Sequence, residues 1–243
     1  MRDLHVHSTF SDGADEPEAI VCAAIGKGLT EIGFSDHSYL YMDRGYTVED
    51  VAAYRKEILR LKEKYAGKIS VLLGIEQDYF TENSPTGYDF VIGSVHYVYM
   101  GGEYIAVDHT PEILRNGIEK HFGGDPYALI EAYFDLVGKV VEKTGADIVG
   151  HFDLITKFNE KTPLFDETHP RYVAAWKKAA DALIKTGKPF EINTGAVARG
   201  YRSQPYPSPA VREYLAERGA KFIWSSDSHK KETLCFGFPE TEN

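Results

Sequence analysis

The chain has 243 residues, 43% hydrophobic and 13% aromatic, which excludes a disordered protein and suits a single domain over residues 1–243. Its net charge of −10 disfavours broad contact with nucleic-acid phosphates, so we expect no nucleic-acid partner. Two cysteines without a CxxC motif, and no apolar run of membrane-spanning length, indicate a cytoplasmic protein without a membrane partner.

Seven short β-rich runs are expected to form strands. In chain order they cover residues 3–7, 31–36, 69–77, 88–96, 146–151, 189–194 and 221–227. Proline-led first turns and capping residues predict helices between most of them. These helices cover residues 17–24, 47–65 with Thr47 as the cap, 125–145, 169–187 and 208–219, and a further helix starts at 110–111.

The alternation of strands and helices argues for a parallel sheet, and seven repeats predict a closed or nearly closed α/β barrel of the TIM type. An open, doubly wound sheet is the alternative. The connection 97–124 is longer than a usual strand-to-helix loop, so we expect it to cover the site. No long helix follows the seventh strand.

Metal-binding side chains recur where the expected strands end. Six of the seven strands end in this way, and the residues are His5, His7, His37, Glu76, His96, His151, Asp227 and His229. A ninth candidate, Asp12, lies in the loop after the first strand. The C-terminal edge of the strands is where β/α barrels carry their chemistry. We therefore expect a metal site at that edge.

Each of these motifs alone has an ordinary structural explanation. The His-x-His pair could be two polar residues at a strand end, and a buried Glu76 could be an ion-pair partner. The gathering of these residues favours the metal site, because six of the nine histidines fall at one edge of the expected barrel. The remaining three, His109, His121 and His169, fall in loop or helix contexts.

The donor types indicate which metals would bind. Six imidazoles and three carboxylates without a thiolate suit divalent zinc, manganese, iron or cobalt. Nine donors are too many for one tetrahedral ion, so we expect two or three ions, with Glu76 able to bridge two of them. Clustered cations attract an anion and are suited to the hydrolysis of phosphate esters.

These motifs, in this order, resemble the PHP (polymerase and histidinol phosphatase) family, specifically its stand-alone histidinol-phosphatase branch. The matching stretches, between residues 3 and 229, are DLHVHSTFSDG, GFSDH, GIEQD, IGSVH, GHFDLITKF, EINTG and SSDSH. The resemblance implies a distorted (β/α)7 barrel and three divalent ions of zinc, manganese or iron. It further implies hydrolysis of L-histidinol phosphate to L-histidinol and phosphate, a step of histidine biosynthesis, by a hydroxide that bridges two metals.

The resemblance also implies a role for each site residue. One ion would be held by His5, His7, Glu76 and Asp227, a second by Glu76, His96 and His151, and a third by Asp12, His37 and His229. Of these ligands, Glu76, Asp227 and His229 are expected to be catalytic. Arg199 would contact the substrate phosphate. Thr156 stands where related phosphatases often have an arginine, which leaves Lys157 as the candidate for a second basic contact.

Three aspartates and the end of the chain leave questions open. Asp3, Asp36 and Asp153 lie beside ligands and could orient imidazole rings, or could be ordinary solvated or capping residues. The absence of a final helix puts the closure of the barrel in question. Tyr97 and other loop tyrosines flank the site; they could pack on an imidazole-bearing substrate, but we expect them to serve packing of the protein itself.

Four other functions are compatible with parts of this pattern. A nuclease or nucleotide phosphodiesterase, or a phosphatase for another small metabolite, could use the same metals. An amidohydrolase also begins with His-x-His but typically has a lysine at its fourth strand, where this chain has His96. A non-catalytic metal-binding module would tend to lose ligands, and none is missing here.

Overall fold

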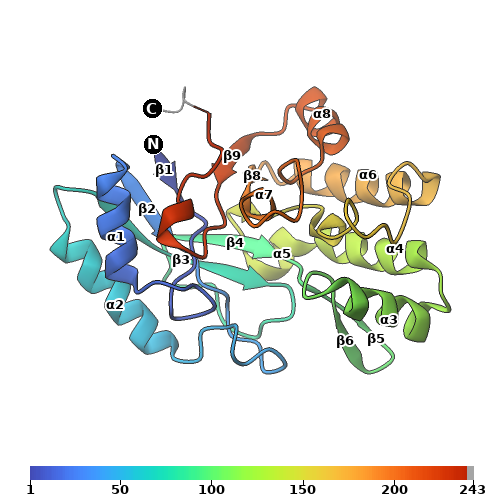
Figure 1. Cartoon of the computed structure of the whole chain (residues 1–243), viewed down its shortest axis with the longest axis horizontal. Coiled ribbons are helices and arrows are strands. Elements are labelled where there is room, and N and C mark those ends of the chain that lie inside the picture. Colours follow the sequence, from blue (N-terminus) through green and yellow to red (C-terminus); the bar gives the residue numbers. More distant parts are fainter. Residues whose placement is uncertain (240–243) are drawn as a thin grey trace.

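The computed structural model describes residues 1–239 and is built around a seven-stranded parallel sheet that curls into a barrel (Figure 1). The strands, in their order across the sheet, are β1 (Arg2–Asp3), β2 (Glu31–Phe34), β3 (Ser70–Asp78), β4 (Phe90–Ser94), β7 (Ile148–Val149), β8 (Phe190–Asn193) and β9 (Phe222–Ser225). All seven expected strands are present. Their sequential order confirms the distorted (β/α)7 barrel, because a doubly wound sheet would reverse its order at a switch point.

Apolar side chains fill the interior of the barrel. They form a cluster of Leu4, Phe90, Ile92 and Ile148. A Cβ on Gly33 would lie 2.7 Å from the Phe90 ring, and one on Gly74 would lie 2.2 Å from it. These two strand glycines therefore make room for an aromatic ring that fills the space between β2, β3 and β4.

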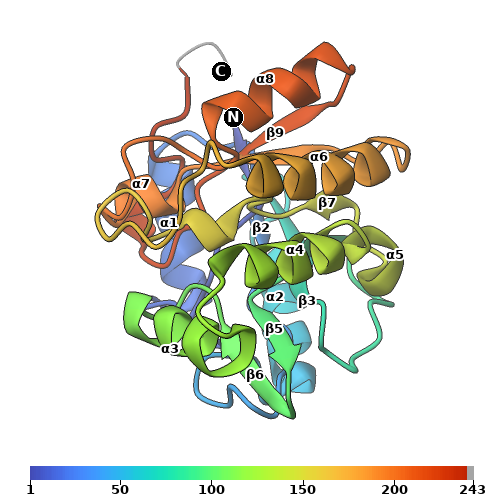
Figure 2. The same ribbon diagram turned by 90° about the vertical axis from the view of Figure 1, so that its right-hand side faces the viewer.

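Helices cover the outside of the barrel on two opposite sides (Figures 1 and 2). Their bounds are α1 (Pro17–Gly26), α2 (Val51–Lys64), α3 (Pro111–Phe122), α4 (Pro126–Val137), α5 (Val140–Thr144), α6 (Pro170–Ile184), α7 (Gly195–Ala198) and α8 (Pro209–Glu217). On one side α1 and α2 bury apolar faces against β2 and β3. On the other side α4 and α6 pack together over β7 and β8. Within the described residues, no helix combines the length and the apolar character that crossing a membrane would need.

Two expected helix boundaries are wrong. The cap of α2 is Asp50, whose Oδ1 accepts a hydrogen bond from the Ala53 amide (2.8 Å), because Thr47 is buried in the preceding loop and donates to the Asp43 carbonyl (3.3 Å). The expected helix 125–145 is split into α4 and α5 at Gly138. A Cβ there would lie 3.3 Å from Ala179 Cα, so glycine permits the close approach of α6 and also weakens the helix.

The two edges of the sheet meet at the C-terminal end of the strands, and no long helix follows β9 within residues 1–239. Val6 and Ser228 form a parallel bridge, in which the His7 amide donates to the Ser228 carbonyl (2.9 Å) and the Ser228 amide donates to the His5 carbonyl (3.1 Å). A short 3-10 turn, η2 (Lys231–Thr233), follows and packs beside α1 (Figure 1). The question raised by the missing helix is thereby answered, because this tail covers the seam.

The long connection 97–124 forms its own small layer. It contains an antiparallel hairpin of β5 (Tyr97–Met100) and β6 (Glu103–Ala106), followed by α3. The sequence did not indicate this hairpin. Tyr97, at the start of β5, and His109, between β6 and α3, line the pocket at the C-terminal edge of the barrel. This confirms that the connection covers this edge.

Asp3 ties the two ends of the chain together at the seam. Its carboxylate is fully buried and accepts hydrogen bonds from the amide and hydroxyl of Ser226 (3.2 and 2.5 Å) and from the Cys235 amide (2.9 Å). Burial raises the pKa of this carboxyl, although the hydrogen bonds oppose the rise. The carboxylate is therefore a connection between β1, the end of β9 and the tail.

Replacing Asp3 by alanine should lower the free energy of unfolding by roughly 2–4 kcal/mol, because the buried amide and hydroxyl of Ser226 and the half-buried Cys235 amide lose their acceptor. Urea denaturation of the purified variant measures this change. Glu213→Ala, at an exposed position on α8, serves as the control and should stay within about 0.5 kcal/mol of the parent. Equal stability of the two variants would contradict the role of Asp3.

Candidate metal centre

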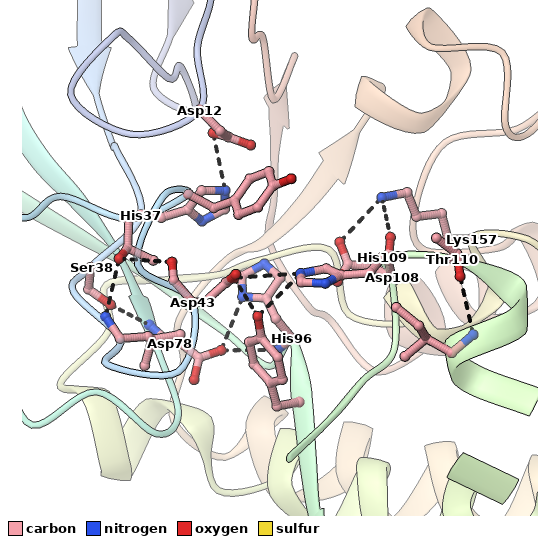
Figure 3. A pocket seen from close by; sticks show the side chains of 15 residues that line it. Asp12, His37, Ser38, Asp43, Asp78, His96, Asp108, His109, Thr110 and Lys157 are labelled. Carbon is pink, nitrogen blue, oxygen red and sulfur yellow. Dashed lines mark hydrogen bonds and ion pairs between the residues drawn. The ribbon is translucent and has the colours of Figure 1, made fainter. Parts of the chain in front are cut away.

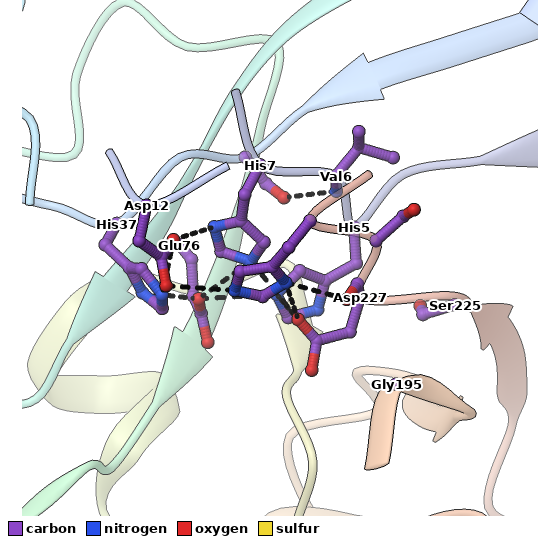
Figure 4. Close-up of polar contacts among 12 residues, drawn as sticks. His5, Val6, His7, Asp12, His37, Glu76, Gly195, Ser225 and Asp227 are labelled. Carbon is purple, nitrogen blue, oxygen red and sulfur yellow. Dashed lines mark hydrogen bonds and ion pairs between the residues drawn. The ribbon is translucent and has the colours of Figure 1, made fainter. Parts of the chain in front are cut away.

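The nine predicted metal-binding residues come together at the C-terminal edge of the barrel. Figure 4 shows His5, His7, Asp12, His37, Glu76 and Asp227 among them. They form four overlapping groups whose donor atoms lie within 4.8 Å of one another. The groups are His7, Asp12, His37 and His229; His5, His7 and Asp227; His5, Glu76 and His151; and His37, Glu76 and His96. Residues from six strand ends and one loop therefore share a single cluster.

Glu76 lies at the centre of this cluster and is fully buried. Its Oε2 faces three imidazoles, at 3.3 Å from His5 Nε2, 3.6 Å from His7 Nε2 and 2.8 Å from His37 Nδ1. Its Oε1 faces two others, at 2.8 Å from His151 Nε2 and 3.3 Å from His96 Nε2. The two oxygens of one carboxylate thus serve two different sets of donors, as a bridging ligand must.

The remaining carboxylates face the other imidazoles. Asp12 Oδ2 lies 3.1 Å from His229 Nε2, and its Oδ1 lies 3.6 Å from His37 Nε2. Asp227 Oδ1 lies 3.3 Å from His7 Nε2. Asp12 and His37 line the pocket and His229 is partly exposed, whereas Asp227 is buried. This side of the cluster is therefore the one that a substrate can reach.

Several buried polar atoms of the cluster have no hydrogen-bond partner among the described residues. They are His5 Nε2, both ring nitrogens of His7, and Glu76 Oε2. Unpaired buried polar atoms are rare and costly, so four of them converging on one place require a group that binds them all. Imidazole nitrogens and carboxylate oxygens are donors that suit a borderline divalent cation, and the site fits such ions.

The electrostatics of the cluster agree with metal binding. Burial and the neighbouring His229 and His37 lower the pKa of His7 to about 3, which keeps this imidazole in the neutral form that binds metals. Burial opposes ionisation of Glu76, but His37, His5 and His96 outweigh it and hold the pKa of Glu76 well below its usual range. Glu76 is therefore ionised, and without a cation its negative charge is balanced by protonated imidazoles around it.

Asp227 is held in place by an unusual backbone and a glycine neighbour. Its φ is +50°, which is rare for a non-glycine residue. A Cβ on Gly195 would lie 2.7 Å from Asp227 Oδ2, so the EINTG motif ends in glycine to admit this side chain (Figure 4). The strained position indicates a functional constraint on the carboxylate.

The three aspartates that lie beside ligands in the sequence bind the scaffold and not the imidazoles. Asp3 binds Ser226 and Cys235, while Asp36 accepts hydrogen bonds from Ser8 and Ser11. Asp153 accepts a hydrogen bond from the Ser208 amide (2.8 Å). Of the two roles that the sequence left open for these aspartates, the contacts favour the structural one, because their oxygens bind hydroxyl and amide groups of the scaffold.

Glu191 and Asp78 orient the imidazoles instead. Glu191 Oε1 lies 2.6 Å from His5 Nδ1, and its Oε2 accepts a hydrogen bond from the His151 amide (2.9 Å). Asp78 Oδ2 lies 3.1 Å from His96 Nδ1. Both carboxylates are buried, and each leaves the other nitrogen of its imidazole directed at Glu76. Glu191 lies within the EINTG motif, which was the available sequence signal.

The two basic residues expected to contact substrate both lie at the site. Arg199 donates from Nη2 to Asp227 Oδ2 (3.0 Å) and lies beside His229. Lys157 lines the pocket and donates to the carbonyl of Asp108 (2.7 Å). Thr156 accepts a hydrogen bond from the buried Arg202. A third basic residue, which sequence reasoning missed, therefore lies next to the position where an arginine was expected.

A pocket of about 390 Å³ opens beside the cluster (Figure 3). Asp12, His37 and His96 line one part of it. The loop after β2 and the connection 97–124 line most of the rest, through Asp43, Tyr46, Tyr97, Asp108, His109, Thr110 and Ile113. Lys157, which follows β7, completes the wall. His109 was grouped with the loop histidines on sequence grounds, and the structure places it in the pocket wall.

Glu191→Gln should weaken zinc binding by about 10–100-fold, because the amide keeps the shape of the side chain but loses the charge that orients His5. Competition with a chromophoric chelator measures the affinity. Glu112→Gln, at an exposed position on α3, is the matched control and should bind zinc like the parent. Unchanged affinity in a folded Glu191→Gln protein would contradict the orienting role.

Zinc binding at pH 7 should release protons. Burial opposes the charged form of His37, but Glu76 and Asp12 outweigh it and raise the pKa of His37 to about 9, so the metal-free imidazole holds a proton that the ion must displace. The apparent affinity should therefore fall as the pH falls below about 9. Calorimetry in buffers of different ionisation enthalpy counts the protons, and His37→Gln should release fewer. Binding without proton release would contradict this assignment.

Comparison with known proteins agrees with the motifs. "Probable histidinol-phosphatase" of Deinococcus radiodurans is 30% identical over 98% of this chain and 90% of its own length. "Probable histidinol-phosphatase" of Schizosaccharomyces pombe is 26% identical over 87% of this chain and 74% of its own. A structure of histidinol phosphate phosphatase from Lactococcus lactis, complexed with zinc, L-histidinol and phosphate, is 25% identical with a TM-score of 0.71 and covers 95% of this chain and 86% of that one.

The fold also matches that of a candidate histidinol phosphatase from Listeria monocytogenes, with a TM-score of 0.85 at 21% identity and 98% coverage of both chains. The family model of the PHP domain matches residues 3–195. These residues contain all the predicted metal ligands except Asp227 and His229. The predicted resemblance is confirmed, and the chain belongs to the PHP domain family.

Proposed function

We propose that the chain acts as one metal-dependent phosphomonoesterase domain over residues 1–243 and hydrolyses L-histidinol phosphate to L-histidinol and phosphate. The observation that carries the proposal is the convergence of unpaired buried nitrogens and a carboxylate oxygen beside an open pocket. The relatives named as histidinol-phosphatases, and the Lactococcus lactis structure with histidinol and phosphate, support the substrate. Two unpaired cysteines are consistent with work in the cytoplasm.

The proposed cofactor is a set of three divalent ions of zinc, manganese or iron. The contacts of Glu76 support the allocation in which His5, His7 and Asp227 hold one ion, and His96 and His151 hold a second, with Glu76 bridging both. Asp12, His37 and His229, with His7 close by, would hold the third. Ions of this kind lower the pKa of bound water and neutralise charge on phosphoryl oxygens.

The chain's own residues would orient the ester and balance its charge. The Arg199 guanidinium lies at the open side of the cluster, where it can donate to phosphoryl oxygens as charge develops on them. Lys157 supplies a second positive charge at the far side of the pocket. The connection 97–124 limits access of water to the alcohol part of the substrate.

The nuclease alternative has less support. The chain is 31% identical to the PolX DNA polymerase/3'-5' exonuclease of Bacillus subtilis, but over 47% of this chain and 21% of that protein. A pocket of about 390 Å³ suits a small metabolite. The net charge of −10 also opposes contact with a polynucleotide.

The purified protein, loaded with zinc, manganese or iron, should release phosphate from L-histidinol phosphate, and chelation should abolish the activity. Each of His96→Ala and Asp227→Ala should lower kcat/KM by at least about 100-fold, because each removes a donor from the cluster. A phosphate-release assay with circular dichroism as a folding check measures this. His121→Ala, on α3, is the control. Activity on a bis-ester alone, or unchanged activity in folded variants, would reject the proposal.

A further inference from the structure

His109 belongs to a hydrogen-bonded triad in the pocket wall. Its Nε2 lies 3.2 Å from the Tyr97 hydroxyl oxygen and 3.5 Å from Asp43 Oδ2, and the Tyr97 hydroxyl donates to the same Asp43 oxygen. Both partners lie on the Nε2 side of the ring. Within residues 1–239, Nδ1 has no protein partner, and the side chain is 36% exposed. The imidazole is therefore fixed at one nitrogen and open to the pocket at the other.

The triad shares the pocket with the metal centre. Figure 3 shows His109 between a group that includes His37 and His96 and the pair formed by Asp108 and Lys157. In a phosphate monoester, the oxygen that joins phosphorus to the alcohol lies between the phosphoryl group and the alcohol part. If the phosphoryl group binds at the cluster, the alcohol part extends into the pocket that His109 lines.

Charges around His109 favour its protonated form. The groups that face it are Asp43 from the loop after β2, Tyr97 and His96 at the start of β5, and Asp108 from its own loop. The hydrogen bond to Asp43 is the largest influence and raises the pKa of His109, with Asp108 adding to the rise, while burial and His96 oppose it. The arrangement resembles the carboxylate–imidazole pairs of acid–base catalysis, in which the carboxylate fixes the tautomer.

We propose that His109 is the general acid that protonates the departing alcohol, and that Asp43 is the positioning residue that holds its imidazole. The inference rests on the proposed function. In this step the bond between phosphorus and the ester oxygen breaks, and its electron pair goes to that oxygen. A water oxygen forms the new bond to phosphorus, and the proton that water loses passes to solvent. His109 Nδ1 gives its proton to the departing oxygen and regains one from solvent.

Two other donors in the pocket are less suited to this step. The Lys157 ammonium is held by the carbonyl and the carboxylate of Asp108, at 2.7 and 3.3 Å. The Tyr97 hydroxyl is directed at Asp43 and is buried, so its proton is already engaged. His109 is therefore the donor in this wall that combines an open nitrogen with a fixed ring.

The test uses the dependence of rate on the leaving group. A general acid matters for an alkoxide, which leaves poorly, and hardly at all for the acidic p-nitrophenol. The metal-loaded parent and His109→Asn proteins are compared on L-histidinol phosphate, on simple alkyl phosphates and on aryl phosphates of graded acidity. His109→Asn should lower kcat for the alkyl esters by about 100-fold or more and kcat for p-nitrophenyl phosphate by less than about 3-fold. Asp43→Asn should also make kcat fall more steeply as the leaving group becomes less acidic, but to a smaller extent than His109→Asn.

His121→Asn is the matched control, because His121 also pairs with a carboxylate, Glu103 (3.1 Å), but lies on α3 outside the pocket lining. His121→Asn should leave the dependence of kcat on the leaving group unchanged. Lys157→Met should raise KM without making that dependence steeper. An equal loss on all esters, no loss, or steepening by Lys157→Met in place of His109→Asn overturns the proposal. A parent that hydrolyses simple alkyl phosphates but not L-histidinol phosphate rejects the proposed substrate, while the ester series still decides the role of His109.

A spectroscopic measurement adds a readout that does not depend on turnover. In the zinc-loaded protein with ¹⁵N-labelled histidine, the resonances lost in His109→Asn identify this ring. Protonation of Nδ1 at pH 7 in the parent, and its loss in Asp43→Asn, supports the proposal. An Nδ1 that carries no proton at pH 7 in the parent overturns it.

Discussion

The structure depends on one buried carboxylate. Glu76 is removed from water at the centre of the barrel's C-terminal edge, with five imidazoles around its two oxygens. A buried charge is tolerated only when neighbouring groups compensate it closely. The ends of β1, β2, β4 and β7 supply these imidazoles, so the chain can satisfy Glu76 only when the barrel is assembled. Fold and site are in this sense one electrostatic arrangement.

Much of this arrangement was predictable because it follows the repeat of the fold. Parallel strands of a barrel deliver their last residues to one edge, so His37, His96 and His151 could be placed together from local sequence alone. The trinuclear grouping and the roles of Arg199 and Lys157 came from the family resemblance. The geometry brings the ligands together and leaves these roles as proposals.

The misses have a common cause, which is contact between segments distant in sequence. For Asp3, Asp36 and Asp153 the sequence left open whether they orient imidazoles, and their oxygens instead bind amides of segments distant in sequence. The residue that orients His5 is Glu191, far along the chain on β8. His109 was set aside because it lies in a loop, and only the fold of the connection 97–124 brings it to Asp43. Local sequence carries no information on these pairings.

The seam of the barrel has a consequence for the chain as a polymer. Val6 and Ser228 bridge the seam, and the ligand pairs His5–His7 and Asp227–His229 stand on either side of it. An ion held by His5, His7 and Asp227 would join the two ends of a loop that includes nearly the whole chain. The entropy of closing a loop grows only with the logarithm of its length, so one such link at the seam restricts almost every residue at little more than the cost of closing a short loop. The seam of the barrel is thus the place where a bound cation would hold together the parts of the folded chain that are most distant in sequence.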